Sequence, residues 1–164
     1  MRNVVELAKP RPDFDAILQR YADMVTRLCI VRLGNPHDAE DCFQNVFFKL
    51  FRSSEEFESE EHIKAWLIRA ALHECANRRR YFLRHPAVSL EEIADFLPPA
   101  PEDNHRELLA AVMSLPDADR EIILLCYYHG YSAAEAARMM GKNENTVKSR
   151  LLRAREKLRK ILEE

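Results

Sequence analysis

Hydrophobic residues recur every three or four positions along most of this chain, the spacing of one face of an α-helix. The pattern predicts a first helix over residues 14–33. Its expected apolar face is Ile17, Tyr21, Met24, Val25, Leu28 and Val31. A Gly-Asn-Pro turn at 34–36 ends this helix and starts a second, phenylalanine-rich helix that runs to about Arg52. An acidic loop follows, and then a third helix over 60–84. The chain has three glycines and no run of alternating β-branched residues, so we expect an all-α fold.

A proline-rich segment divides the helices into two groups. Residues 86–104 contain four prolines and several acidic residues, a composition typical of a linker, and one short helix is predicted inside it around Leu90–Phe96. Further helical patterns follow up to Gly130. We therefore expect two small helical domains, residues 1–85 and 105–164, joined by this linker.

The last third of the chain has the features of a helix-turn-helix. Ser132 and Glu135 form a capping box at the start of a short alanine-rich helix, and Gly141 can take the left-handed conformation that ends it. Asn143 then caps a final basic helix, a pattern that places the second helix in the major groove of DNA. Its expected inward side chains are Val147, Leu151, Ala154, Leu158 and Ile161. The candidate DNA-contacting residues are Asn143, Asn145, Thr146, Lys148, Ser149, Arg150, Arg153 and Lys157.

Charge is distributed unevenly, although the formal net charge is only −2. Residues 138–160 carry nine Lys or Arg and two Glu, whereas residues 1–137 carry 16 basic and 23 acidic side chains. A basic face alone would also fit the solvated side of an ordinary bundle helix. Because it occurs with two helix caps and a glycine turn, DNA binding is favoured, and the acidic part of the chain suits a protein partner.

The cysteines and histidines form no recognisable catalytic or metal-binding motif. None of the four cysteines lies in a CxxC pair; they are Cys29, Cys42, Cys75 and Cys126. With no signal peptide and no apolar run of membrane-spanning length, we expect a cytoplasmic protein without membrane insertion and with buried thiols, redox sensing or metal binding being the alternatives. His73 and Glu74 begin like an HExxH zinc motif, but Asn77 stands where the second His should be. No nucleophile–base set appears, so we expect no enzyme activity, cofactor or metal site.

Several motifs together resemble a known family. Residues 141–158, read Gly-Lys-Asn-Glu-Asn-Thr-Val-Lys-Ser-Arg-Leu-Leu-Arg-Ala-Arg-Glu-Lys-Leu, resemble the recognition helix of region 4 of bacterial sigma factors. The Leu-Pro at 115–116 and Tyr-His-Gly-Tyr-Ser at 128–132 resemble the same region. Two further motifs resemble region 2 of the same family: Asp-Ala-Glu-Asp at 38–41, followed by Gln, Val and Phe, and Trp-Leu-Ile-Arg-Ala-Ala at 66–71. The short linker leaves no room for a further domain, which is typical of the extracytoplasmic-function (ECF) type.

The resemblance implies roles for two helices of the first domain. The second helix would dock on the clamp helices of RNA polymerase through Asp41, Gln44, Phe47 and Phe48. Core packing is the alternative for Phe47 and Phe48 and stays open here. The third helix would bind the −10 element, whose single-stranded bases stack on aromatic side chains over a positive track.

The residues that the resemblance assigns to the −10 element are His73, Asn77, Arg78, Arg79, Arg80 and Tyr81. Trp66 is assigned to the core rather than to base stacking. His73 stands where the family often has Asn, seven residues after the Trp, which predicts an unusual −10 preference.

The resemblance therefore predicts a sigma factor that binds core RNA polymerase and directs promoter-specific initiation. The helix-turn-helix would read the −35 element, and an anti-sigma factor is expected as a further partner. A stand-alone helix-turn-helix regulator is the first alternative, but such proteins usually dimerise on a palindrome and no dimerising helix is evident. A pure interaction module without promoter activity is the second.

Overall fold

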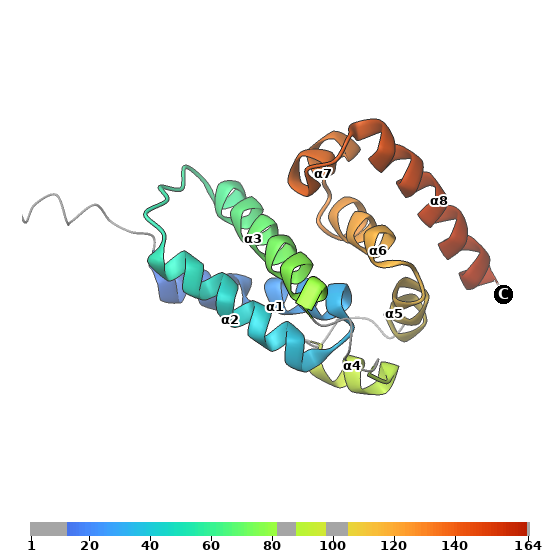
Figure 1. Cartoon of the computed structure of the whole chain (residues 1–164), viewed down its shortest axis with the longest axis horizontal. Helices are drawn as coiled ribbons and strands as arrows, with labels where there is room; N and C mark the ends of the chain where they lie inside the picture. The colour runs from blue at the N-terminus through green and yellow to red at the C-terminus, as the bar shows by residue number, and fades with distance from the viewer. Residues whose placement is uncertain (1–12, 82–87, 98–104, 164) are drawn as a thin grey trace, which may run out of the picture.

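The structure, a computed structural model, describes residues 13–81, 88–97 and 105–163, and within these ranges the side chains of residues 79–81, 105 and 106 lie outside the description. Every regular element in the described ranges is helical, which confirms the all-α fold (Figure 1). The helices are α1 (Phe14–Leu33), α2 (Pro36–Arg52), α3 (Glu60–Tyr81), α4 (Leu90–Phe96), α5 (His105–Met113), α6 (Asp117–Ile123), α7 (Ala133–Met140) and α8 (Glu144–Glu163). A π-helical turn, Leu124–Tyr128, continues α6.

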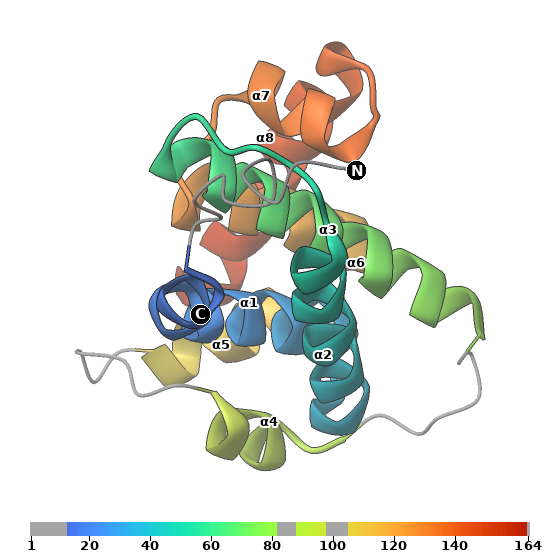
Figure 2. The ribbon, with the colours of Figure 1, turned by 90° about the vertical axis from the view of Figure 1, so that its left-hand side faces the viewer.

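Helices α1, α2 and α3 pack around a common apolar core (Figure 2). The predicted junction between α1 and α2 is confirmed, because local signals determine it: the Asn35 side chain accepts hydrogen bonds from the backbone N–H groups of His37 (3.0 Å) and Asp38 (3.3 Å). Gly34 ends α1 with φ +66°, a conformation that favours glycine. The predicted end of α3 at position 84 lies outside the described residues.

Helix α1 is buried on two opposite sides. Residues 28–32 are all buried, so this part of the helix faces protein all round. Helices α2 and α3 cover one side, and α6 of the second helical group packs against the other. The residues expected on the apolar face of this helix did not include Ile30, which is buried as well.

An ion network sits where α1 meets α6. The Arg32 guanidinium is 2.9 Å from a carboxylate oxygen of Glu121 and 3.9 Å from one of Asp117, and its side chain is 8% exposed. Asp117 also pairs with Arg120. Gly34 lies next to this group, since a Cβ built on it would be 3.8 Å from a terminal nitrogen of Arg120 and 3.4 Å from the Met113 methyl carbon. The two predicted domains therefore share one continuous apolar core with a buried ionic contact across it.

A second set of contacts links the groups near the π-helical turn. Arg27 of α1 donates a hydrogen bond to the Tyr128 hydroxyl and lies 5.2 Å from the centre of its ring, while Lys64 of α3 lies 5.5 Å from the ring of Tyr131. His129 sits between them. Burial, together with the charges of Lys64 and Arg27, lowers the pKa of His129 to about 4, so its ring is neutral at pH 7.

The helix-turn-helix forms as predicted. The Ser132 hydroxyl accepts a hydrogen bond from the Glu135 N–H (3.1 Å), and the Glu135 carboxylate accepts one from the Ser132 N–H (2.8 Å). Gly141 ends α7 with φ +63°. The Asn143 side chain then caps α8 by accepting from the Asn145 N–H at 2.8 Å.

One inward position of α8 was predicted wrongly. Val147 and Ala154 are buried and Leu151 and Leu158 are partly buried, as expected. Ile161 is 41% exposed, because the last turns of α8 extend past the helices that cover its beginning (Figure 1).

The predicted linker helix is confirmed as α4, which packs against α2. Ser89 caps it through a hydrogen bond from the Glu92 N–H (3.3 Å), and Ile93 is its buried anchor. Phe96 is 52% exposed and lies edge-on to His37 at the start of α2. The linker is thus attached to the first helical group by a small apolar contact.

The ion network predicts unequal effects for two arginines of α1. Arg32→Met should lower the free energy of unfolding by about 3 kcal/mol, because it leaves the mostly buried Glu121 carboxylate without its cation. Arg20→Met is the control, since Arg20 pairs with Glu60 at 3.5 Å while 64% exposed, and its cost should stay below about 1 kcal/mol. Denaturant unfolding measures both, and equal costs would show that the buried pair does not hold the two groups together.

Candidate nucleic-acid interface

The N-terminal half of α8 presents an uninterrupted polar surface. Asn145, Thr146 and Ser149 are exposed there, whereas Val147 is buried. Asn143 is exposed too, but its side chain is used as the helix cap, so it contributes by placing the helix start. Residues near the start of the second helix of a helix-turn-helix are those that reach base edges.

The cations of α8 differ in how far they are already engaged. Lys148 pairs with Glu144 at 3.0 Å on the same helix, and Lys157 pairs with Asp119 of α6 at 3.4 Å. Arg150 is partly buried, whereas Arg153 is exposed and has no ion pair within the described part of the chain. Of these four cations, Arg153 is therefore the freest to meet a phosphate or a guanine edge.

The helix α2 carries an exposed aromatic surface. Phe48 is 53% exposed with the Arg52 guanidinium 4.2 Å from its ring centre, and Gln44 is exposed one turn before it. Phe51 is 60% exposed and was not among the predicted docking residues, although its position three residues after Phe48 is a signal that could have found it. Phe47 belongs to the core: it is 4% exposed, and its ring packs against that of Phe43 with 4.7 Å between the ring centres.

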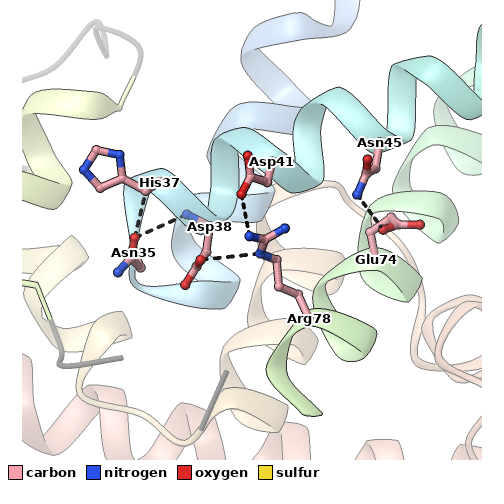
Figure 3. A network of polar contacts seen from close by, with 7 residues as sticks. All are labelled: Asn35, His37, Asp38, Asp41, Asn45, Glu74 and Arg78. Atoms are coloured by element: carbon pink, nitrogen blue, oxygen red, sulfur yellow. Dashed lines mark hydrogen bonds and ion pairs between the residues drawn. The ribbon is translucent and has the colours of Figure 1, made fainter. Parts of the chain in front are cut away.

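The helix α3 brings its candidate residues into two different settings. His73 and Asn77 are exposed and lie 3.2 Å apart through their side-chain nitrogens, one helical turn from each other. Arg78 instead turns toward α2, where it pairs with Asp38 and with Asp41 (Figure 3). The side chains of Arg79, Arg80 and Tyr81 lie outside the described residues. Asp41 and Arg78, predicted for two different partners, thus contact each other.

An open groove lies between the two helical groups, where α3 approaches α7. It has a volume of about 690 Å³ and is lined by Trp66, Arg69 and His73 of α3 and by Met139 and Met140 of α7, among others. Trp66 is half-buried, with its ring 6.0 Å from that of Phe57. The exposed face of α3 is therefore partly covered by the helix-turn-helix.

The thiols are in apolar surroundings. Cys29, Cys42 and Cys75 are buried, as predicted, whereas Cys126 is only partly buried. A hydrogen bond with Cys75, together with burial, raises the pKa of the Cys42 thiol far above its usual range, so this thiol stays protonated and unreactive. In the part of the chain that the structure describes, no group of three His, Cys, Asp or Glu side chains is arranged to hold a metal ion. None of the described helices has the length and apolar character needed to cross a bilayer.

Comparison with known proteins assigns each helical group to a known protein family. Residues 17–81 match the family model of Sigma-70 region 2, and residues 105–158 match that of Sigma-70 region 4. The ECF RNA polymerase sigma factor SigM of Mycobacterium tuberculosis is 32% identical over 160 residues, which cover 95% of this chain and 80% of that protein. The ECF RNA polymerase sigma factor SigE of Mycolicibacterium smegmatis is 35% identical over 162 residues, covering 92% of this chain and 62% of that protein.

A solved structure has the same arrangement of helices. The sigma factor RpoE of Bartonella quintana, in complex with the anti-sigma factor NepR, aligns with a TM-score of 0.72 and 26% identity over 93% of this chain and 98% of that one. The two regions thus occur here in one chain, in order, with relatives that match along nearly all of it. This chain belongs to the extracytoplasmic-function family of RNA polymerase sigma factors.

Proposed function

We propose that this sigma factor directs promoter-specific initiation by dividing the work between residues 1–85 and 105–164, joined by the linker 86–104. The first part binds core RNA polymerase through α2 and the −10 element through α3, and the second brings α8 to the −35 element. The observation that carries the proposal is the joint presence of a capped helix with a basic face and a separate helix with an exposed aromatic face. The polymerase performs the chemistry, and this chain is no enzyme.

At the −35 element, α8 lies in the major groove. Asn145, Thr146 and Ser149 reach base edges from the first turns of the helix, and Arg150 and Arg153 reach a base edge or phosphates further along. Lys148 and Lys157 join them after exchanging their carboxylate partners for phosphates. Asn143 fixes where the helix begins and so which side chains enter the groove.

At the polymerase, α2 provides an aromatic contact surface, which we define as Gln44, Phe48 and Phe51 with Asp41 at its edge. Exposed aromatic residues are enriched in protein interfaces, because each removes a large apolar area from water when it binds. Phe47 is left out of this surface since its ring is already buried in the core.

At the −10 element, His73 and Asn77 are the described residues that can meet an unpaired base. They share one exposed face of α3, and their hydrogen-bonding groups are adjacent. Arg79, Arg80 and Tyr81 remain assigned to the same element from the sequence, as a positive and aromatic track for single-stranded DNA.

Binding both elements requires the two domains to separate. The numbers −35 and −10 put the two elements about 25 base pairs apart, which is about 85 Å of duplex at about 3.4 Å per base pair. In the structure α3 contacts α7, and the Arg32 network joins α1 to α6. We propose that the described arrangement is a closed form that opens on the polymerase.

An anti-sigma factor is proposed as a second protein partner. The RpoE structure that shares this fold contains one. A partner that binds the closed form would compete with polymerase, and both would act in the cytoplasm.

Run-off transcription tests the function directly. Purified core polymerase with this chain should start transcription at specific positions on genomic promoter fragments, whereas core polymerase alone should not. A stand-alone regulator would instead bind a palindromic duplex unaided. Specific duplex binding by the chain alone, with no specific starts in the presence of polymerase, would contradict the proposal.

The −35 assignment predicts a loss at one arginine of α8. Arg153→Ala should weaken promoter binding by the holoenzyme by about 1–3 kcal/mol and reduce the slope of log affinity against log salt by roughly one unit. Arg159→Ala is the control, because Arg159 is exposed on the same helix but pairs with Glu156 at 3.1 Å beyond the proposed contact region. Filter binding over a salt series measures both, and equal slopes for both variants would place the DNA-reading face elsewhere.

The docking assignment predicts a loss at Phe48. Phe48→Ala should weaken capture of core polymerase about tenfold, since truncation of an aromatic anchor costs more than about 1 kcal/mol. Phe96→Ala removes an equally exposed ring from α4, with 52% against 53% exposure, and should change capture less than about twofold. Titration of labelled polymerase measures the affinities, and thermal melting shows whether either variant alters the fold. Capture that is unaffected by Phe48→Ala overturns the assignment.

A further inference from the structure

A polar seam runs along the contact between α2 and α3 (Figure 3). At one end, Glu74 of α3 pairs with Lys49 at 2.5 Å and accepts a hydrogen bond from Asn45 at 3.3 Å. At the other end, Arg78 of α3 reaches two carboxylates of α2, with its Nε atom 3.4 Å from Asp38 and a terminal nitrogen on Asp41. The seam holds the two helices in one register.

The start of α2 places the two carboxylates together. Asp38 and Asp41 are three residues apart in the first two turns of α2, which Asn35 caps, so their side chains lie on the same side of the helix. Their negative charge is stabilised near the positive end of the helix dipole. The Arg78 side chain that reaches both carboxylates is only 19% exposed, and the Asp38 side chain is 16% exposed.

This arrangement limits what Arg78 can do for DNA. Two carboxylates neutralise its charge, and a phosphate that approaches Arg78 also approaches Asp38 and Asp41. Asp41 is different in one respect, because its side chain is 53% exposed and can be reached from outside while it still holds Arg78. Asp41 thus lies where the proposed polymerase surface and the proposed −10 surface meet.

We propose that Asp38 and Asp41 position Arg78 away from nucleic acid in the free chain, and that polymerase binding at Asp41 releases Arg78 to a phosphate of the single-stranded −10 region. This inference rests on the proposed function of α2 and α3. A basic group of the polymerase that pairs with Asp41 takes one of these two carboxylates away from Arg78, so the guanidinium can exchange the other for DNA. By thermodynamic linkage, DNA bound at Arg78 also strengthens polymerase binding at Asp41.

The first test uses the free full-length chain and a short fluorescent single-stranded DNA of mixed sequence. Asp38→Asn should tighten binding about threefold or more, because it frees Arg78 from one carboxylate. Glu40→Gln is the matched control: it removes the same charge from the same turn of α2, and Glu40 is exposed without an ion pair among the described residues. Its effect should stay below about twofold. Equal gains from both variants would mean a general charge effect and overturn the proposal.

The second test asks whether the gain belongs to Arg78. Adding Arg78→Ala to Asp38→Asn should abolish the gain, as a double-mutant cycle detects. A gain that survives shows that another cation was released and also overturns the proposal. Asp41→Asn removes the other carboxylate and should also tighten binding of the single-stranded probe. If thermal melting shows a folding defect in one of the two variants, the other still tests the proposal.

The third test separates this proposal from the proposed function. With core polymerase present, the wild-type chain and Asp38→Asn should bind the same single-stranded probe with equal affinity, since polymerase has already released Arg78. A persistent difference overturns the release step. Failure of the wild-type chain to capture polymerase at all would instead contradict the docking function, while the Asp38→Asn gain in the free chain would still show that Arg78 is held back.

Discussion

The structure depends on α1 being enclosed from two sides. Its residues 28–32 pack against α2 and α3 on one side and against α6 on the other, and Arg32 carries an ionic contact across the second interface. Removing α6 would take the carboxylates of Glu121 and Asp117 away from Arg32 and expose its side chain to water. The first helical group is therefore fully covered only when α6 is docked on it, and the two groups share one apolar core.

The elements set by local chemistry could be predicted from the sequence, and those set by distant contacts could not. Asn35, Ser132, Gly141 and Asn143 act within a few residues of themselves, so the helix boundaries at these positions were predicted correctly. Burial of Ile30 and exposure of Ile161 were missed for one reason. Periodicity reports that a face is apolar, but which helix covers it depends on tertiary packing.

At the candidate sites, too, the residue types could be predicted from the sequence, whereas the contacts of each side chain could not. The sequence identifies a basic stripe and an aromatic helix by composition, but it does not show which members are already engaged. Phe47 and Phe48 are adjacent and identical, yet one is buried and the other half-exposed. Arg153 and Lys157 are one turn apart, yet only Lys157 has a carboxylate partner on another helix. Such partners are made by long-range contacts, so only the fold reveals them.

The docking of α6 on α1 also lowers the apparent affinity of the chain for promoter DNA. If promoter DNA binds only open molecules, the apparent dissociation constant equals the intrinsic one divided by the open fraction. Each 1.4 kcal/mol by which the Arg32 interface favours closure reduces that fraction about tenfold. Substitution of Arg32, which lies on α1 outside the helix-turn-helix, would therefore tune promoter occupancy without altering a single contact to DNA.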